Sequence, residues 1–254
     1  MLFFQTELAL SNMIVNLQAE GWEIIYHRAH ALLAAQIAGY WDFSKQTYRL
    51  YETIAAIAHH DHLEKEWQGN QLTEAGAPLD FTLDNESPVD KLRQHADEAL
   101  YQGRWVAMLI SMHLCFLNQG KGEEDAEMAS FLKEQRQRQT QWQTELEITP
   151  EDAEAAYTYM RWCDRLSLIL SQRQIPAGGR KLEITNGPDG ERYSVYELDS
   201  GDLSVTPWPF SCEKFTVKVD ASYLSQLQFS SNDELIQALK NAPRKSLSWT
   251  LKKS

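Results

Sequence analysis

The sequence predicts a mainly α protein, in which a helical bundle is followed by a small β-rich C-terminal appendage, so that the chain is α+β overall. Two observations lead to this fold class. Apolar residues recur at helical spacing from about residue 28 to residue 172, and after residues 175–179 the chain changes to short strand-like segments separated by turn residues. We therefore expect three parts: an N-terminal extension and hairpin over residues 1–26, a helical domain over 27–175, and a β-rich appendage over 176–254 that packs on it.

The first expected elements are a hairpin and two helices. Residues 13–15 and 22–26 have strand composition and flank a turn. Helices are expected over residues 28–41 and from about 45 to 62, because apolar residues recur in both at intervals of three and four. His30 falls on the apolar face of the first helix and Asp61 on that of the second.

Further helices follow a long connection at residues 64–87, whose length is typical of functional lids. One of them carries His95, and the next has His113 on its apolar stripe. Residues 123–146 predict one or two amphipathic surface helices. A last long helix begins at the capping signature of residues 149–152 and has Asp164 on its apolar face.

The remaining residues have the pattern of a small sheet. Segments with strand composition are separated by turns rich in Gly, Asn and Asp, and a short helix begins near Asn232. The expected strands are residues 181–185, 192–198, 203–206, 214–219 and 246–251.

Composition narrows the choice of partners and compartment. The formal net charge of −12 makes nucleic acid an unfavourable partner. No apolar run reaches the ~20 residues that a membrane helix needs, so we expect no membrane partner. Three well-separated cysteines and an N-terminus without a basic flank fit a cytoplasmic protein. The sequence does not determine whether the chain forms a homo-oligomer.

Several metal-binding residue types fall on faces that should be buried. His30, Asp61, His113 and Asp164 belong to four separate predicted helices, and His60 precedes Asp61. Burying an unpaired carboxylate is costly, and the cost disappears if the carboxylate neutralises a cation. Imidazole and carboxylate ligands together suit Fe, Mn, Zn, Ni or Co. The sequence therefore predicts a site for a divalent transition metal.

The order of these residues resembles the HD-domain superfamily, which consists of metal-dependent phosphohydrolases named for an adjacent His-Asp pair. His30 stands as the first ligand, His60-Asp61 as the pair and Asp164 as the last acid. Local segments, including residues 29–34, 56–61, 78–81 and 109–113, are similar to a bacterial HD-like family of unknown function. In two-metal members two more histidines lie in this interval, so the resemblance implies one or two ions and adds His95 and His113 as ligands.

The resemblance implies a hydrolase that acts on a small phosphorylated or otherwise anionic substrate through metal-activated water. Asp61 would bridge two ions, and His59 or His62 would be a proton donor. Lys65 is a candidate catalytic lysine after the pair, although residues 62–67 depart from the related family's pattern. Arg28 and Arg165 are candidates for binding the anionic group of the substrate.

The sequence is also consistent with two other functions. The same six ligands also occur in mixed-valent di-iron oxygenases, and a regulatory protein could keep the metal without chemistry. Simpler interpretations compete for single residues as well. His113 can be a core histidine bonded to a backbone carbonyl, His95 lies on a polar helix, and His27, three residues before His30, is expected to be exposed.

Overall fold

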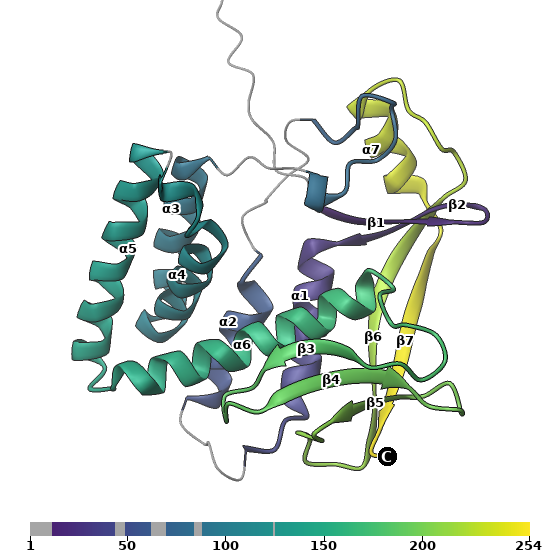
Figure 1. Ribbon diagram of the computed structural model, residues 1–254. Coiled ribbons are helices and arrows are strands. Elements are labelled where there is room, and N and C mark those ends of the chain that lie inside the picture. Colours follow the sequence, from purple (N-terminus) through teal and green to yellow (C-terminus); the bar gives the residue numbers. More distant parts are fainter. Residues whose placement is uncertain (1–11, 44–48, 62–69, 84–87, 124) are drawn as a thin grey trace, which may run out of the picture.

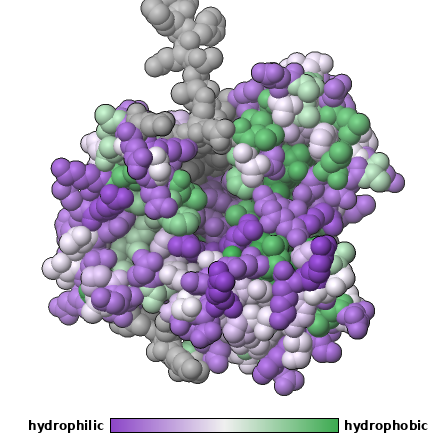
Figure 2. Space-filling model, viewed as in Figure 1, coloured by the Kyte–Doolittle hydropathy of each residue, from purple (hydrophilic) through white to green (hydrophobic). Residues whose placement is uncertain are grey.

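The structure is a computed structural model, and it describes residues 12–43, 49–61, 70–83, 88–123 and 125–254. Helices occupy one side of the molecule and a curled sheet occupies the other, with α1 and α6 between them (Figure 1). The face seen in this view is largely hydrophilic, and hydrophobic residues gather mainly at the upper right (Figure 2). No helix in the described part of the chain is long and apolar enough to cross a membrane.

Among the described residues, seven strands form one sheet, which joins the hairpin of residues 13–26 to the C-terminal strands. The hairpin of β1 (Met13–Gln18) and β2 (Gly21–Tyr26) pairs antiparallel with β6 (Lys214–Leu224) through Trp22↔Leu224. Gly21 lies so close to the Leu224 carbonyl that a Cβ would stand 2.0 Å from that oxygen, so only glycine fits at φ +128°. The sheet then continues through β7 (Arg244–Lys252), β5 (Leu203–Thr206), β4 (Arg192–Glu197) and β3 (Leu182–Asn186).

The helices follow the apolar periodicity of the sequence. A capping box closes the start of α6, where the Thr149 side chain accepts from the Asp152 amide and Asp152 accepts from the Thr149 amide. The α-helices are α1 (His27–Gly39), α2 (Leu50–His59), α3 (Val89–Ala99), α4 (Arg104–Asn118), α5 (Ala126–Glu145), α6 (Pro150–Ser171) and α7 (Asn232–Asn241). Short 3-10 turns lie at η2 (Phe81–Leu83), η3 (Leu100–Gln102) and η4 (Lys121–Glu123).

One hydrophobic core joins the helices to the sheet. Trp162 on α6 has no exposed surface, and its ring packs edge-on against Trp41, Tyr193 and Phe210 at centroid distances of 4.8, 5.5 and 5.9 Å. Trp41 follows α1, Tyr193 is in β4, and Phe210 precedes β6. The helical and β-rich regions therefore bury their apolar faces against each other, as a helix layer on a sheet must.

The expected fold class is wrong. The described structure is 49% helical and 23% strand, and its sheet has seven strands, so it is not a mainly α bundle with a small appendage. The individual strands were predicted close to their observed positions, but the hairpin of residues 13–26 was expected to lie apart from the C-terminal strands. Pairing of β2 with β6 unites them because each would otherwise leave a row of backbone N–H and C=O groups without partners.

A buried carboxylate ties the sheet to the end of α6. Glu23 in β2 has no exposed surface, and it accepts hydrogen bonds from Arg173 Nε at 2.7 Å, Arg173 Nη2 at 2.6 Å and the Tyr223 hydroxyl at 2.7 Å. Burial raises the pKa of Glu23, but the hydrogen bonds from Arg173 and Tyr223 outweigh it and hold the pKa below 4.5. The ionised form of Glu23 therefore stabilises the folded state.

We expect Glu23→Gln to lower the free energy of unfolding by about 2 kcal/mol at neutral pH, because it weakens charge-assisted hydrogen bonds to Arg173. The folded-state pKa of Glu23 is lower than the unfolded one, so its contribution is full above about pH 4.5 and is lost as pH falls through the folded-state pKa. Urea unfolding of both proteins between pH 7 and pH 3 measures this. If the difference in free energy of unfolding between the two proteins stayed constant from pH 7 to pH 3, the stabilising role of ionised Glu23 would be contradicted.

Candidate metal centre

Five side chains from four helices converge where α1, α2, α4 and α6 meet. His30 comes from α1, His60 and Asp61 from the end of α2, His113 from α4 and Asp164 from α6. They form two overlapping groups, His30–His60–Asp164 and His60–Asp61–His113, and within each group the ligand atoms lie within 4.8 Å of one another. These distances are short enough for the side chains to hold a metal ion.

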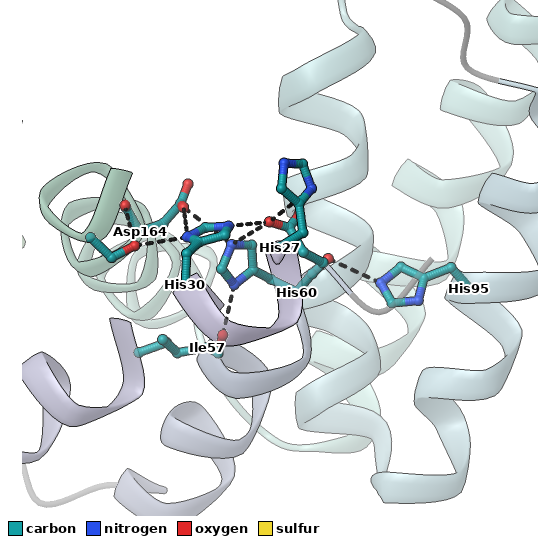
Figure 3. Close-up of polar contacts among 8 residues, drawn as sticks. His27, His30, Ile57, His60, His95 and Asp164 are labelled. Atoms are coloured by element: carbon teal, nitrogen blue, oxygen red, sulfur yellow. Dashed lines mark hydrogen bonds and ion pairs between the residues drawn. The ribbon is translucent and has the colours of Figure 1, made fainter. Parts of the chain in front are cut away.

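The packing of α1 against α2 and α6 brings His30, His60, Asp61 and Asp164 together. His30 lies on the buried face of α1 with Leu33, Ala34 and Ile37. Helix α2 ends at His59, and His60 is its C-cap with φ −61° and ψ −30°. The last turn of α2 therefore directs the His60 side chain toward His30 and Asp164 (Figure 3). The next residue, Asp61, contacts His30 Nε2 through Oδ2.

His30 and His60 each have their Nδ1 atom hydrogen-bonded to a protein oxygen. His60 Nδ1 donates to the Ile57 carbonyl at 2.6 Å, because a carbonyl can only accept. The Ser167 hydroxyl donates to the Asp164 carbonyl at 2.8 Å, so it accepts from His30 Nδ1 at 2.9 Å. These bonds fix the tautomer of each ring and leave both Nε2 atoms facing the cluster, which is the usual arrangement around metal-binding histidines.

Each Nε2 atom faces a carboxylate. His30 Nε2 contacts Asp61 Oδ2, and His60 Nε2 lies 3.1 Å from Asp164 Oδ1 and 3.3 Å from Asp61 Oδ2. A neutral imidazole with its proton on Nδ1 would turn a lone pair toward these negative oxygens. Such an arrangement is favourable only with a proton or a cation between nitrogen and oxygen. The donor set therefore fits a metal ion, whose ligands are neutral imidazole and ionised carboxylate.

The electrostatics of the cluster agree with this interpretation. Burial would lower the pKa of His60, but the charges of Asp61 and Asp164 raise it well above 6.5. Burial would raise the pKa of both aspartates, but His60 and hydrogen bonds from the histidines lower the two values. A cation that replaced the proton of His60 would leave both carboxylates ionised and paired.

His113 differs from the other two histidines. Its Nδ1 is buried and makes no hydrogen bond to any described residue, so it is not bonded to a backbone carbonyl as the simplest interpretation of a core histidine requires. Burial, together with the nearby charge of His60, lowers the pKa of His113 to about 4. The ring is therefore neutral at pH 7 and has a lone pair for a cation. Its centroid lies 5.0 Å from that of His60.

The other predicted site residues lie outside this cluster. His95 is buried, and its Nε2 donates to the backbone carbonyl of His60 at 3.1 Å instead of facing the carboxylates. His59 Nδ1 donates to the Ala55 carbonyl at 2.8 Å, and His59 and His95 both line a separate cavity of about 340 Å³. Both His62 and Lys65 lie outside the described residues.

Neither arginine proposed from the sequence has a hydrogen bond or ion pair with the five clustered side chains in the described part of the chain. Arg28 Nη2 is buried without a hydrogen-bond partner there, and Arg165 is half-buried on α6. Their expected role in binding the substrate stays a prediction.

Sequence reasoning missed the contribution of His27. Its side chain is 13% exposed, its Nδ1 lies 3.9 Å from Asp61 Oδ2, and its ring packs edge-on against Phe81 at 4.4 Å. The expectation that His27 is exposed is therefore wrong. Burial lowers its pKa to about 4, so His27 is a neutral neighbour of the cluster. The available signal was its spacing of three residues from His30, which places both on nearly the same helix face.

The residues of the cluster differ in exposure. His30 and His60 are each 1% exposed, whereas the side chains of Asp61 and Asp164 are 19% and 14% exposed. The histidines thus form the buried wall of the site, and the carboxylates lie on its solvent side. A molecule that enters from solvent would meet the two carboxylates and any ion they hold.

Comparison with known proteins gives one family. The model described as "Protein of unknown function (DUF3891)" matches residues 13–226. No curated protein and no solved structure matches the chain. The expected resemblance to the HD-domain superfamily is wrong on these findings, because the matching family is a different one and the fold has a seven-stranded sheet.

Proposed function

We propose that this chain, which belongs to the DUF3891 family of proteins of unknown function, is a metal-dependent hydrolase that acts on a small anionic molecule. One observation carries the proposal. The two buried imidazoles present Nε2 to the carboxylates of Asp61 and Asp164 while Nδ1 is held by protein oxygens, and this arrangement calls for a cation between them.

The donor set limits which ions fit. Three imidazoles and two carboxylates suit Zn, Fe, Mn, Ni or Co better than Ca or Mg, which prefer oxygen ligands. When bound, such an ion lowers the pKa of water and polarises a phosphoryl or carbonyl oxygen. His60 belongs to both groups of three ligand residues, and this arrangement fits one ion as well as two.

The residues of the chain have distinct parts in this proposal. His30, His60 and His113 bind from the buried side, and Ser167 and the Ile57 carbonyl keep two of these rings oriented. Asp61 and Asp164 bind from the solvent side, and Asp61 is close enough to His30 and His60 to accept a proton or orient a water molecule. The positive charge of an ion would attract an anionic substrate in spite of the net charge of −12.

The position of His95 does not favour the di-iron alternative, which needs His95 as a sixth ligand. Its Nε2 is bonded to the His60 carbonyl. The alternative of a regulatory protein without chemistry has no specific observation in its favour. Hydrolysis is therefore the function that the arrangement supports best.

The test is turnover of a panel of phosphomonoesters and phosphodiesters by the purified chain with added Mn, Ni, Co or Zn. We expect hydrolysis of at least one class, abolition by a chelator with recovery when metal is restored, and a fall in kcat/KM of roughly 100-fold or more in His60→Ala. A thermal melt of His60→Ala separates loss of the site from loss of the fold. Absence of turnover with every added metal, or full activity in folded His60→Ala, would refute the proposal.

A further inference from the structure

A cationic side chain lies one helical turn from the candidate metal centre. Arg161 is on α6 three residues before Asp164, a rise of about 4.5 Å along the helix axis. Its guanidinium carbon lies 4.2 Å from the ring centroid of Phe116 and 5.9 Å from that of Tyr157. Phe116 in turn lies three residues after His113 on α4. The two helices that carry His113 and Asp164 therefore also hold this arginine.

Arg161 is held by aromatic rings instead of by a carboxylate. Among the described residues it makes no hydrogen bond and no ion pair, although the chain has a net charge of −12. Elsewhere in the described part of the chain, six other arginines each pair with an acid: Arg49, Arg93, Arg104, Arg138, Arg173 and Arg192. The rings restrict where the guanidinium can lie and leave its N–H groups available to a ligand, since a ring face accepts charge but satisfies few donors.

The surroundings of Arg161 are open to solvent on one side. Phe116 is 38% exposed, Arg161 is half-buried, and Tyr157 is buried behind them with 4% of its surface exposed. Asp164, whose side chain is 14% exposed, lies one turn away on the same helix. Arg161 therefore lies one helical turn from Asp164, on a part of α6 that solvent reaches.

We propose that Arg161 binds a second anionic group of the substrate, a carboxylate or a phosphate, while the metal centre binds the first. A planar guanidinium binds either group through two parallel hydrogen bonds. Phe116 is the positioning residue that keeps the guanidinium in place. This inference rests on the proposed function for the role of the metal centre, and it narrows the substrate class to small molecules with two anionic groups.

Two probes that cannot be hydrolysed test this directly. Phenylphosphonate has one anionic group, and 4-phosphonobenzoate adds a carboxylate on the far side of the ring. Isothermal titration of the full chain loaded with Mn should give a Kd for 4-phosphonobenzoate about tenfold lower than for phenylphosphonate. In Arg161→Ala the preference should disappear, with the affinity for phenylphosphonate and the metal content unchanged. Arg161→Lys should retain part of the preference, because it keeps the charge and loses the planar fork.

The matched control is Arg192→Ala, which removes an arginine that is 77% exposed in β4 and pairs with Glu183 across the sheet. It should leave both affinities unchanged. Equal affinity for the two probes in the wild-type protein, retained preference in Arg161→Ala, or no binding of either probe would overturn the proposal. The hydrolase proposal can fail separately. If the protein bound 4-phosphonobenzoate more tightly than phenylphosphonate because of Arg161 but hydrolysed no substrate, the anion site would stand and the proposed hydrolysis would be refuted.

Discussion

Replacing Asp61 with asparagine should remove most of the metal that the chain binds. The change keeps the size of the side chain but removes the carboxylate that contacts His30 Nε2 and lies 3.3 Å from His60 Nε2. Changes even in groups that only orient metal ligands cost 10- to 100-fold in metal affinity, so we expect at least about 100-fold for Asp61→Asn. The measurement is metal content by elemental analysis after dialysis, followed by titration with the metal found in the wild-type protein.

The control for Asp61→Asn is the same substitution at an exposed aspartate. Asp97 is 63% exposed and accepts a hydrogen bond from Arg138 at 2.7 Å on the surface of α3, so Asp97→Asn should bind metal as the wild-type protein does. A thermal melt of both variants checks that the fold is retained. Wild-type affinity in Asp61→Asn would show that Asp61 is not a ligand. Absence of metal uptake in the wild-type protein would leave the His-Asp cluster as a structural ion-pair network.

Replacing Trp162 with alanine should have the largest effect on stability. The side chain has no exposed surface and joins α6 to Trp41 after α1, to Tyr193 in β4 and to Phe210. Loss of a buried aromatic side chain costs about 3–5 kcal/mol through lost burial and the cavity that remains. Because the ring touches both the helices and the sheet, we expect one cooperative urea transition, displaced equally when followed by far-UV circular dichroism and by Trp fluorescence.

The comparison for Trp162→Ala is Tyr51→Ala. Tyr51 is 86% exposed on α2, so its removal should change the free energy of unfolding by less than about 0.5 kcal/mol. If Trp162→Ala instead produced two transitions with only one displaced, the sheet and the helices would unfold as separate units. The shared core around Trp162 would then not determine the stability of the whole chain.

The sequence by itself located most helices and strands and the residues that enter the site. His30, Asp61, His113 and Asp164 stood out because each occupies an apolar position of a helical repeat, and such periodicity is a property of neighbouring residues alone. The capping signature at Thr149 and Asp152 and the turns between β3, β4 and β5 were visible for the same reason. Local patterns also indicated His95, but they could not say in which direction its ring nitrogens point.

Only the tertiary structure decided the sheet and the composition of the site. Trp22 pairs with Leu224 across about two hundred residues, and backbone pairing at that separation leaves no periodic trace in the sequence, so the fold class was predicted wrongly. The packing of α1 against α2 likewise brought His27 beside Asp61, and the placement of α3 turned His95 to the His60 carbonyl. Spacing along one helix determines which face a side chain occupies, whereas the neighbours of that face are determined by how the helices pack against each other.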